Sequence, residues 1–415
     1  MTTNICNRAD ISTKIIMLCI FILPSLMTVV AGATSFASGL VVSCVIAIAI
    51  SILSGRCWFG LGGVTLFSAF LFLSCLFFVH FLLIGMYSDL RGQDLYRLAT
   101  SIIIVSFFSF SALVISSRIK KVSDCSFNSA ISFTAIALLI NGIAGTLKID
   151  FFNTGLAKPT LAFQEPSHLI ICAIPFIIYY YKIMQSKIKR AILISVVLFY
   201  GAYVQNLTTI LAALFVMCIS SRKTILAAIC TLIVVTLLYI IIPDENITYF
   251  TSRMNINDVN NISLLVLIQG WENAILTLHI NPFGVGFQQF GIASEIGDAT
   301  YTLRSIASQD LNVLDGGSTA PKIIGEFGVF GILFIIFYVF YIFSISRKLK
   351  RINDDKKLIF MYSCIMATFF DMFVRGAGYF TPTMFMGVVS VMYIAQNSIR
   401  NDLKKKSNVK HIVYN

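Results

Sequence analysis

Residues 62–86 read GGVTLFSAFLFLSCLFFVHFLLIGM and contain no charged side chain. A helix of about 20 apolar residues spans the hydrocarbon core of a bilayer. Strands of a membrane barrel would alternate apolar and polar residues, and this stretch does not alternate. Residues 62–86 therefore predict a membrane-spanning α-helix, and the rest of the chain repeats the pattern.

Apolar blocks run through the whole chain, in which 57% of the residues are hydrophobic and 12% are charged. Soluble domains carry roughly twice that charged fraction. We therefore expect an all-α integral membrane protein, with residues 1–415 forming one polytopic domain of about twelve transmembrane helices. The expected spans are residues 15–31, 36–54, 62–86, 98–116, 127–147, 167–181, 191–204, 207–220, 224–242, 322–345, 358–374 and 382–397.

Residues 191–220 allow two alternatives, one long helix or a hairpin of two short helices that turns near Gln205 and Asn206. Short basic loops mark the cytoplasmic side of a membrane protein. With the hairpin, 23 of the 31 Lys and Arg residues face the cytoplasm and 8 face outward. This asymmetry favours the hairpin, both termini inside, and a large outer loop at residues 243–321 that contains an amphipathic helical pattern at residues 264–280.

The net charge of +12 lies mostly in short loops, such as residues 118–121 and 347–351. That placement is typical of topology charge, so we expect no nucleic-acid partner. The ten Cys residues contain no C-x-x-C pair, and most lie in apolar blocks, where they act as small hydrophobic residues. The sequence therefore predicts no disulfide framework, no metal site and no cofactor.

The first polar motif is FQEPSH, residues 163–168, at the outer start of the sixth expected span. Pro166 fits the first position of a helix, because its missing N–H needs no partner there. Glu165, Ser167 and His168 would then meet at a helix N-terminus, whose exposed N–H groups favour anions. The alternative is a simple helix cap with an interfacial His.

The second motif is DGGSTAPK, residues 315–322, which begins with Asp315 and opens the tenth expected span. It places Lys322 in a first helical turn, where a cation opposes the helix dipole. The position indicates either a bound anion or a Lys side chain that extends to the lipid headgroups.

The third motif contains Asp371 and Arg375, which lie four residues apart near the end of an expected span. A helix would pair the two side chains on one face. Ionisable residues at membrane depth are candidates for function, and the alternative is a structural ion pair.

Three expected helices open with Pro166, Pro321 and Pro382, and all three run from the outer side to the inner side. Together with Arg253 and Arg304 of the outer loop, their N-termini would form a basic pocket. Arg guanidinium groups bind phosphate oxygens in pairs. We therefore expect a site for a pyrophosphate or another polyanion at the outer surface.

These motifs, in this order, resemble the bacterial O-antigen polymerase family (Wzy) of enterobacteria. The resemblance covers the second half of the chain, and the first 120 residues match only as a membrane bundle. Its motifs are FQEPSH at residues 163–168, NIS at 261–263, QGWE at 269–272, GVGFQQ at 284–289, DGGS at 315–318, GEFG at 325–328 and RGAGYF at 375–380.

The resemblance implies a GT-C-like glycosyltransferase of the bacterial inner membrane, related to the O-antigen ligases and active at the periplasmic face. Such an enzyme joins repeat units linked to undecaprenyl pyrophosphate during lipopolysaccharide biosynthesis, and it needs neither metal nor cofactor. Inner-membrane lipid, a chain-length regulator and the flippase are its further expected partners. The ligases use a periplasmic His near the position of residues 315–318, and this chain has none there. The difference favours a polymerase.

The chemistry needs a base for the acceptor hydroxyl and fixed cations for the departing pyrophosphate. The candidates for the base, in order of preference, are Glu165, His168 and Asp315. The candidates for pyrophosphate binding are Arg253, Arg304, Lys322 and Arg375. The resemblance favours Arg253 and Arg375. The resemblance further implies sugar-binding roles for Trp271, Glu272, Gln288 and Tyr379.

Two alternatives remain open from the sequence. One is an O-antigen ligase, and the other is a transporter of lipid-linked oligosaccharides. Transporters usually show related halves around a site at the membrane midplane, whereas the distinctive residues here gather on one outer face.

Overall fold

The computed structural model describes residues 2–55, 61–87, 92–156, 158–220 and 261–413. These residues are mostly helical and contain no β-strand. The helices are α1 (Thr2–Val30), α2 (Phe36–Leu53), α3 (Leu61–Tyr87), α4 (Leu95–Lys121), α5 (Asp124–Thr146), α6 (Pro166–Ile183), α7 (Lys187–Tyr203), α8 (Leu207–Ser220), α11 (Ile262–Ile280), α12 (Asp298–Ala307), α13 (Thr319–Phe327), α14 (Val329–Arg351), α15 (Lys356–Phe373) and α16 (Pro382–Val413).

Eight helices in the described part of the chain are long and apolar enough to cross a membrane, namely α1 to α6, α11 and α14. The protein is therefore a multi-pass membrane protein. The most apolar parts of α3 and α14 are only 17% buried. Their exposed apolar side chains suit contact with lipid, because a bilayer solvates such surface as well as a protein core does.

The hairpin expected within residues 191–220 is confirmed. Helix α7 ends at Tyr203 and α8 begins at Leu207. Between them the backbone of Gln205 turns with a φ of 52°. The expected span at residues 224–242 lies outside the described residues.

The expectation of one continuous helix over residues 322–345 is wrong. Helix α13 ends at Phe327 and α14 begins at Val329. Gly328 between them has a φ of 58°, and a Cβ there would lie 2.0 Å from the Pro282 carbonyl oxygen. The chain therefore breaks where only glycine fits, and α13 forms a short helix of its own.

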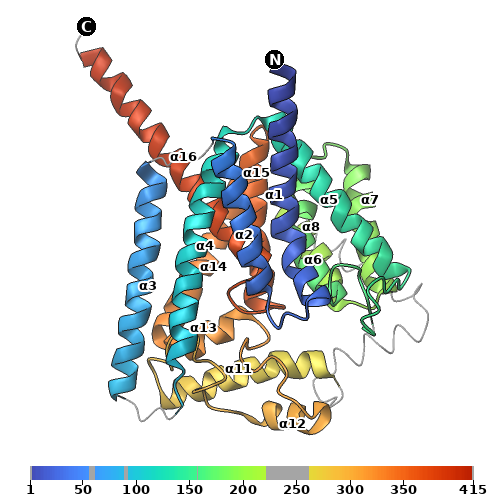
Figure 1. Cartoon of the computed structure of the whole chain (residues 1–415), viewed down its shortest axis with the longest axis vertical. Helices are drawn as coiled ribbons and strands as arrows, with labels where there is room; N and C mark the ends of the chain where they lie inside the picture. Colours follow the sequence, from blue (N-terminus) through green and yellow to red (C-terminus); the bar gives the residue numbers. More distant parts are fainter. Residues whose placement is uncertain (1, 56–60, 88–91, 157, 221–260, 414–415) are drawn as a thin grey trace.

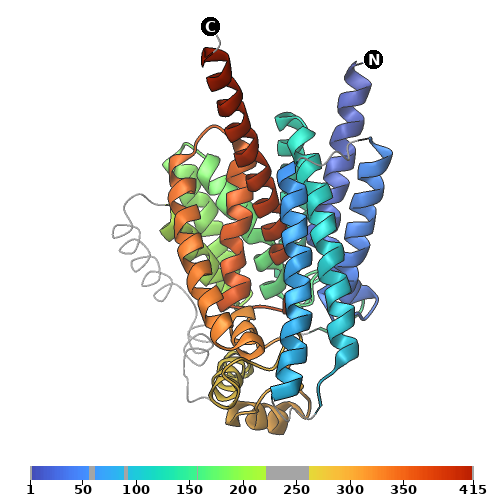
Figure 2. The same ribbon diagram turned by 90° about the vertical axis from the view of Figure 1, so that its left-hand side faces the viewer.

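The two ends of the chain and the large loop lie at opposite ends of the bundle. In Figures 1 and 2 the start of α1 and the end of α16 share one end, and α11 and α12 lie at the other. The basic ends of α4 and α6 lie at the same end as the start of α1 and the end of α16. There Lys120 Nζ donates to the Gln396 carbonyl (3.1 Å), and Lys182 Nζ donates to the Lys350 carbonyl (3.1 Å). We name the opposite end, with α11 and α12, the loop end.

The helix expected at residues 264–280 is present as α11, which lies across the bundle axis at the loop end (Figure 1). It turns polar side chains inward. Gln269 Nε2 donates to the Leu311 carbonyl (3.1 Å), and Asn273 Oδ1 accepts from the Gly297 N–H (2.8 Å). These bonds hold the segments before and after α12 against α11.

The glycine-rich segment after α11 is fixed to both sides. Its backbone pairs with α13, since the Gly286 N–H donates to the Glu326 carbonyl (2.9 Å). The Gln289 side chain bonds the start of α4, where its Oε1 accepts from the Asp94 N–H (2.7 Å) and its Nε2 donates to the Asp94 carbonyl (3.0 Å). Residues far apart in sequence thus form one rigid layer over the loop end.

Candidate functional site

The start of α6 places Glu165 at the rim of the bundle. Glu165 is extended (φ −142°, ψ 152°), because Pro166 follows it and opens the helix. Its carboxylate does not cap α6. It accepts instead from the Ser167 hydroxyl (2.7 Å) and from Arg375 Nη2 (3.1 and 3.3 Å). The alternative of a simple helix cap is therefore wrong for the Glu165 side chain.

The Glu165–Arg375 ion pair joins two segments 210 residues apart. The Glu165 side chain is 46% exposed and that of Arg375 is 18% exposed. Burial opposes ionisation of Glu165, but the charges of Arg375 and His168 and the hydrogen bond from Ser167 outweigh it, so its pKa is lowered from the ordinary value. An ionised carboxylate held by an Arg is a weak proton acceptor.

Asp371 and Arg375 do not pair, and the expectation that they share a helix face is wrong. Helix α15 ends at Phe373, so Arg375 lies in the loop beyond it and turns toward Glu165. Asp371 is fully buried, and neither of its carboxylate oxygens has a hydrogen-bond partner among the described residues.

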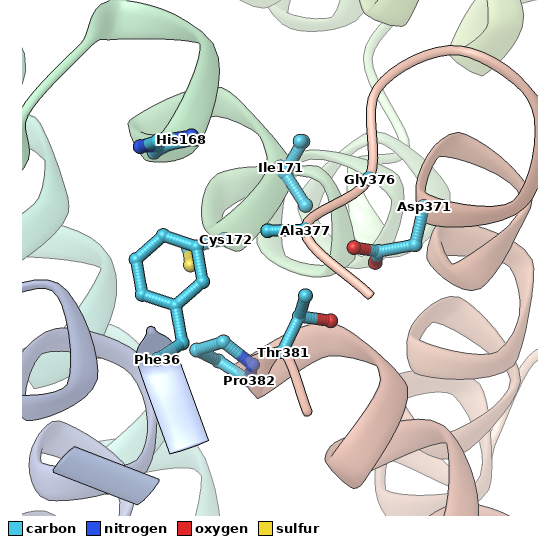
Figure 3. A pocket seen from close by; sticks show the side chains of 9 residues that line it. All are labelled: Phe36, His168, Ile171, Cys172, Asp371, Gly376, Ala377, Thr381 and Pro382. Carbon is cyan, nitrogen blue, oxygen red and sulfur yellow. The ribbon is translucent and has the colours of Figure 1, made fainter. Parts of the chain in front are cut away.

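His168 lies one helical turn into the bundle from Glu165. Its ring packs edge-on against Phe36, with the ring centroids 5.0 Å apart. Its buried Nδ1 atom has no hydrogen-bond partner in the part of the chain that the structure describes. His168 and Asp371 line the same small cavity, shown in Figure 3.

The start of α13 forms a second polar cluster around Lys322. The Lys322 side chain is 1% exposed, and its Nζ donates to the Leu314 carbonyl (2.8 Å) and lies 3.3 Å from Asp315 Oδ1. The same Nζ lies 5.1 Å from the centre of the Tyr379 ring, within the range of a cation–π interaction. A Lys side chain that extends to the lipid headgroups is therefore the wrong alternative.

Tyr379 connects this cluster to Glu326, a buried residue that the sequence analysis missed. The Tyr379 hydroxyl donates to Glu326 Oε2 (2.6 Å). Burial raises the pKa of Glu326, against the opposing charge of Lys322 and the hydrogen bond from Tyr379. Its place as an ionisable residue within the expected span at residues 322–345 was the signal that could have identified it.

Gln288 extends the second cluster toward α4. Its side chain is buried, and its Oε1 accepts from Arg97 Nη2 (3.4 Å). Arg97 is a second functional candidate that the sequence analysis did not identify. It directly precedes the expected span at residues 98–116 and belongs to none of the quoted motifs.

One loop, residues 374–381, carries a residue of each cluster and brings three helix starts together. It contains both Arg375 and Tyr379. The Gly376 N–H donates to the Gly317 carbonyl (3.0 Å) ahead of α13, and α16 opens at Pro382 directly after the loop. The expected meeting of these three helix N-termini is confirmed, except that α13 begins at Thr319 rather than at the proline.

Other candidate residues lie away from these contacts. Arg304 of α12 pairs with Asp310, which follows the helix, and the Arg304 side chain is 39% exposed. Glu272 accepts from the Asp298 (3.1 Å) and Ala299 (2.8 Å) N–H groups, so it caps the start of α12. The neighbouring candidate on α11, at position 271, is a half-buried Trp. Arg253 lies outside the described residues.

No family model matches the chain, and no curated protein matches it. The geometry of the site is therefore the main support for any function. Among the described residues, no group of three or more His, Cys, Asp and Glu side chains is placed to hold a metal ion.

A large apolar cavity adjoins the second cluster. It has a volume of about 690 Å³ and lies between α3, α4, α13, α14, α15 and α16. Tyr379 and Phe287, whose rings stack 5.6 Å apart, line it at the loop end. From there it follows α14 from Phe330 to Tyr341, a rise of about 16 Å. We name it the apolar chamber.

Proposed function

We propose that the protein is an O-antigen polymerase, which joins repeat units linked to undecaprenyl pyrophosphate at the periplasmic face of the bacterial inner membrane. The observation that carries the proposal is the apolar chamber, which reaches the polar cluster of Lys322 and Tyr379. A lipid with an anionic head group needs both parts, because its chain requires an apolar cavity and its phosphates require fixed cations. The sequence resemblance supplies the sugar chemistry.

In this proposal the lipid chain lies in the apolar chamber and the pyrophosphate lies at the loop end. Lys322 and Arg375 stabilise the charge that develops on the pyrophosphate as the bond to the sugar breaks. Both are held in place before substrate arrives, Lys322 by Asp315 and Arg375 by Glu165. Preorganised cations of this kind cost no reorganisation during the reaction.

The acceptor sugar hydroxyl attacks the anomeric carbon of the donor, and a base takes its proton. Glu165 is the weakest of the three candidates, because its lowered pKa makes it a poor acceptor near neutral pH. Asp315 is engaged by Lys322. His168 is the remaining candidate for the base, and since its Nδ1 atom is buried, Nε2 is the ring nitrogen that would take the proton.

A deletion strain tests the function and separates it from its two alternatives. Surface polysaccharide from the strain is resolved on a gel and compared with the same strain carrying the gene on a plasmid. Loss of a polymerase leaves the lipopolysaccharide core with a single repeat unit. A bare core would refute the proposal, because loss of a ligase or of a flippase produces that result.

A variant of the apolar chamber tests the lipid site. Val388 lines the chamber, so Val388→Trp fills part of it, and we expect the complemented strain to make little polymer. Ile136→Trp is the matched control, since Ile136 is 56% exposed on α5 and does not line the chamber. Full polymer from the Val388→Trp strain would remove the chamber from the substrate site.

A further inference from the structure

Helix α11 turns its polar side chains toward the protein and its apolar side chains away from it. Gln269, Asn273 and Thr277 follow one another at intervals of four residues on one face of the helix, and all three are fully buried. Each bonds to a segment beside α12, as when Thr277 Oγ1 accepts from the Glu295 N–H (3.0 Å). A surface helix in water shows the reverse arrangement, with its apolar face buried and its polar face exposed.

The opposite face of α11 is an apolar stripe. Its side chains are all half-buried or exposed, and they are Leu264, Leu265, Leu267, Ile268, Trp271, Ile275, Leu276 and Leu278. Near the middle of the stripe, Ile275 is 56% exposed. The helix contains no Lys, Arg or Asp, and its Glu272 is engaged by backbone N–H groups at the start of α12. A continuous apolar surface of this kind marks contact with a protein or a membrane.

Helix α14 indicates how far the membrane extends toward α11. It exposes apolar side chains from Val329 to Phe343 and carries no charged residue before Arg347. Residues 329–346 rise about 27 Å. The hydrocarbon core of a bilayer is about 30 Å thick, so it extends roughly 3 Å past the start of α14. The side chain found there is Phe283, which follows α11, is 60% exposed and packs against Phe330 with the ring centres 6.0 Å apart.

Helix α3 indicates the same level from another side of the bundle. Its apolar span, Gly63–Met86, contains no Lys, Arg, Asp or Glu and rises about 36 Å. The last turns still expose Leu83 (51%) and Met86 (84%). In Figures 1 and 2 this end of α3 lies level with α11. The boundary of the membrane at the loop end therefore coincides with the position of α11.

We propose that the apolar stripe of α11 lies in the surface of the bilayer at the loop end and binds phospholipid there. The composition of α11 would allow it to cross a membrane, but it lies across the bundle axis and hence along the membrane plane (Figure 1). An apolar helix face in this orientation enters the boundary between headgroups and acyl chains. Trp271 belongs to a residue type that is enriched at this boundary.

The inference goes beyond the proposed function, because no step of sugar transfer depends on it. Its consequence concerns the height of the loop end relative to the lipid. Gly270 of α11 lies against the Gly316 carbonyl, so closely that a Cβ there would lie 1.8 Å from the oxygen. Gly316 directly precedes the start of α13, which carries Lys322. The depth of α11 in the bilayer thus fixes the level of the Lys322 cluster relative to the lipid headgroups.

Fluorescence quenching tests the position of α11 in the full-length protein, reconstituted in phosphatidylcholine vesicles. A fluorescent amino acid replaces Ile275 in one variant and Ile268 in another. The matched control carries it at Ser305, which is exposed on α12, farther from the bundle than α11 (Figure 2). One quencher is a phospholipid with a nitroxide near its headgroup, and the other is iodide in the water.

We expect the nitroxide lipid to quench the probes at positions 275 and 268 strongly and iodide to quench them weakly, with the reverse order at position 305. The relative quenching by nitroxides at different depths should place position 275 about 5–10 Å into the boundary. Iodide quenching as strong as at position 305 would overturn the proposal, since the stripe would then face water. Protection from both quenchers would also overturn it, since protein would then cover the stripe. If one labelled variant fails to fold, the other decides.

Discussion

Replacing Arg375 by alanine separates a structural ion pair from a catalytic cation. The Arg375–Glu165 pair is partly exposed, with side-chain exposures of 18% and 46%. Exposed ion pairs contribute about 0–1 kcal/mol to stability. The carboxylate left behind would keep its hydrogen bond from Ser167, 2.7 Å long, and access to water. Arg375→Ala should therefore reach the membrane at near wild-type level.

The expected effect on activity is much larger. Removing one preorganised donor to a developing charge costs about 3 kcal/mol in the transition state, or roughly 100-fold in rate. Arg375→Lys keeps the charge but loses the two-pronged geometry, so we expect it to rescue only part of the rate. Glu165→Gln combined with Arg375→Ala should be no worse than Arg375→Ala alone, if Glu165 acts mainly by holding the guanidinium.

The assay is the polymer ladder of the complemented deletion strain, with membrane protein measured by immunoblot. Arg304→Ala is the control, because the Arg304 side chain is 39% exposed and pairs with the exposed Asp310, and it should give a ladder close to wild type. A full ladder from Arg375→Ala would refute the catalytic role. Loss of the protein from the membrane would refute the reasoning about stability.

Three further outcomes follow from the contacts. Tyr379→Phe leaves the buried Glu326 without its hydrogen bond and should cost about 1–3 kcal/mol, measured by thermal unfolding in detergent. Gly270→Ala should lower membrane levels sharply, because a Cβ there would lie 1.8 Å from a backbone oxygen, whereas Gly142→Ala meets nothing closer than 3.8 Å and should be tolerated. The pKa of Glu165 is lowered, so its ionised form contributes stability that is complete above the unfolded pKa of about 4.3 and is lost as pH falls below it. The difference in melting temperature between wild type and Glu165→Gln should thus stay constant from pH 6 to pH 8 and shrink only in acid.

The starts of several helices were predictable from the sequence, because a helix start depends on residues close to it in the chain. Pro166 opens α6 and Pro382 opens α16, as the fixed φ of proline leads one to expect. The hairpin near Gln205 was predictable from charge, since basic residues on both sides of it had to share one face. The break at Gly328 was not, because it depends on the Pro282 carbonyl, which lies 46 residues earlier in the chain.

The residues of the candidate site were predictable from the sequence, but the predicted ion pair was wrong. The sequence pointed to Glu165, Lys322 and Arg375 through local motifs. Helical spacing paired Asp371 with Arg375, but α15 ends before Arg375 and the chain turns away. Glu326 was visible as an ionisable residue in the GEFG motif, but its contact with the Tyr379 hydroxyl, 53 residues later in the chain, was not.

By itself, the sequence determined that this is a multi-pass helical membrane protein, and it placed the polar motifs at one end. Those features follow from local hydrophobicity, proline geometry and the placement of charge. Only the tertiary structure decided which charges meet. The partner of Arg375 lies 210 residues away, and the residues that line the small cavity come from α2, α6, α15, α16 and the loop between the last two. Contacts of that range depend on how the helices pack together, which no local pattern records.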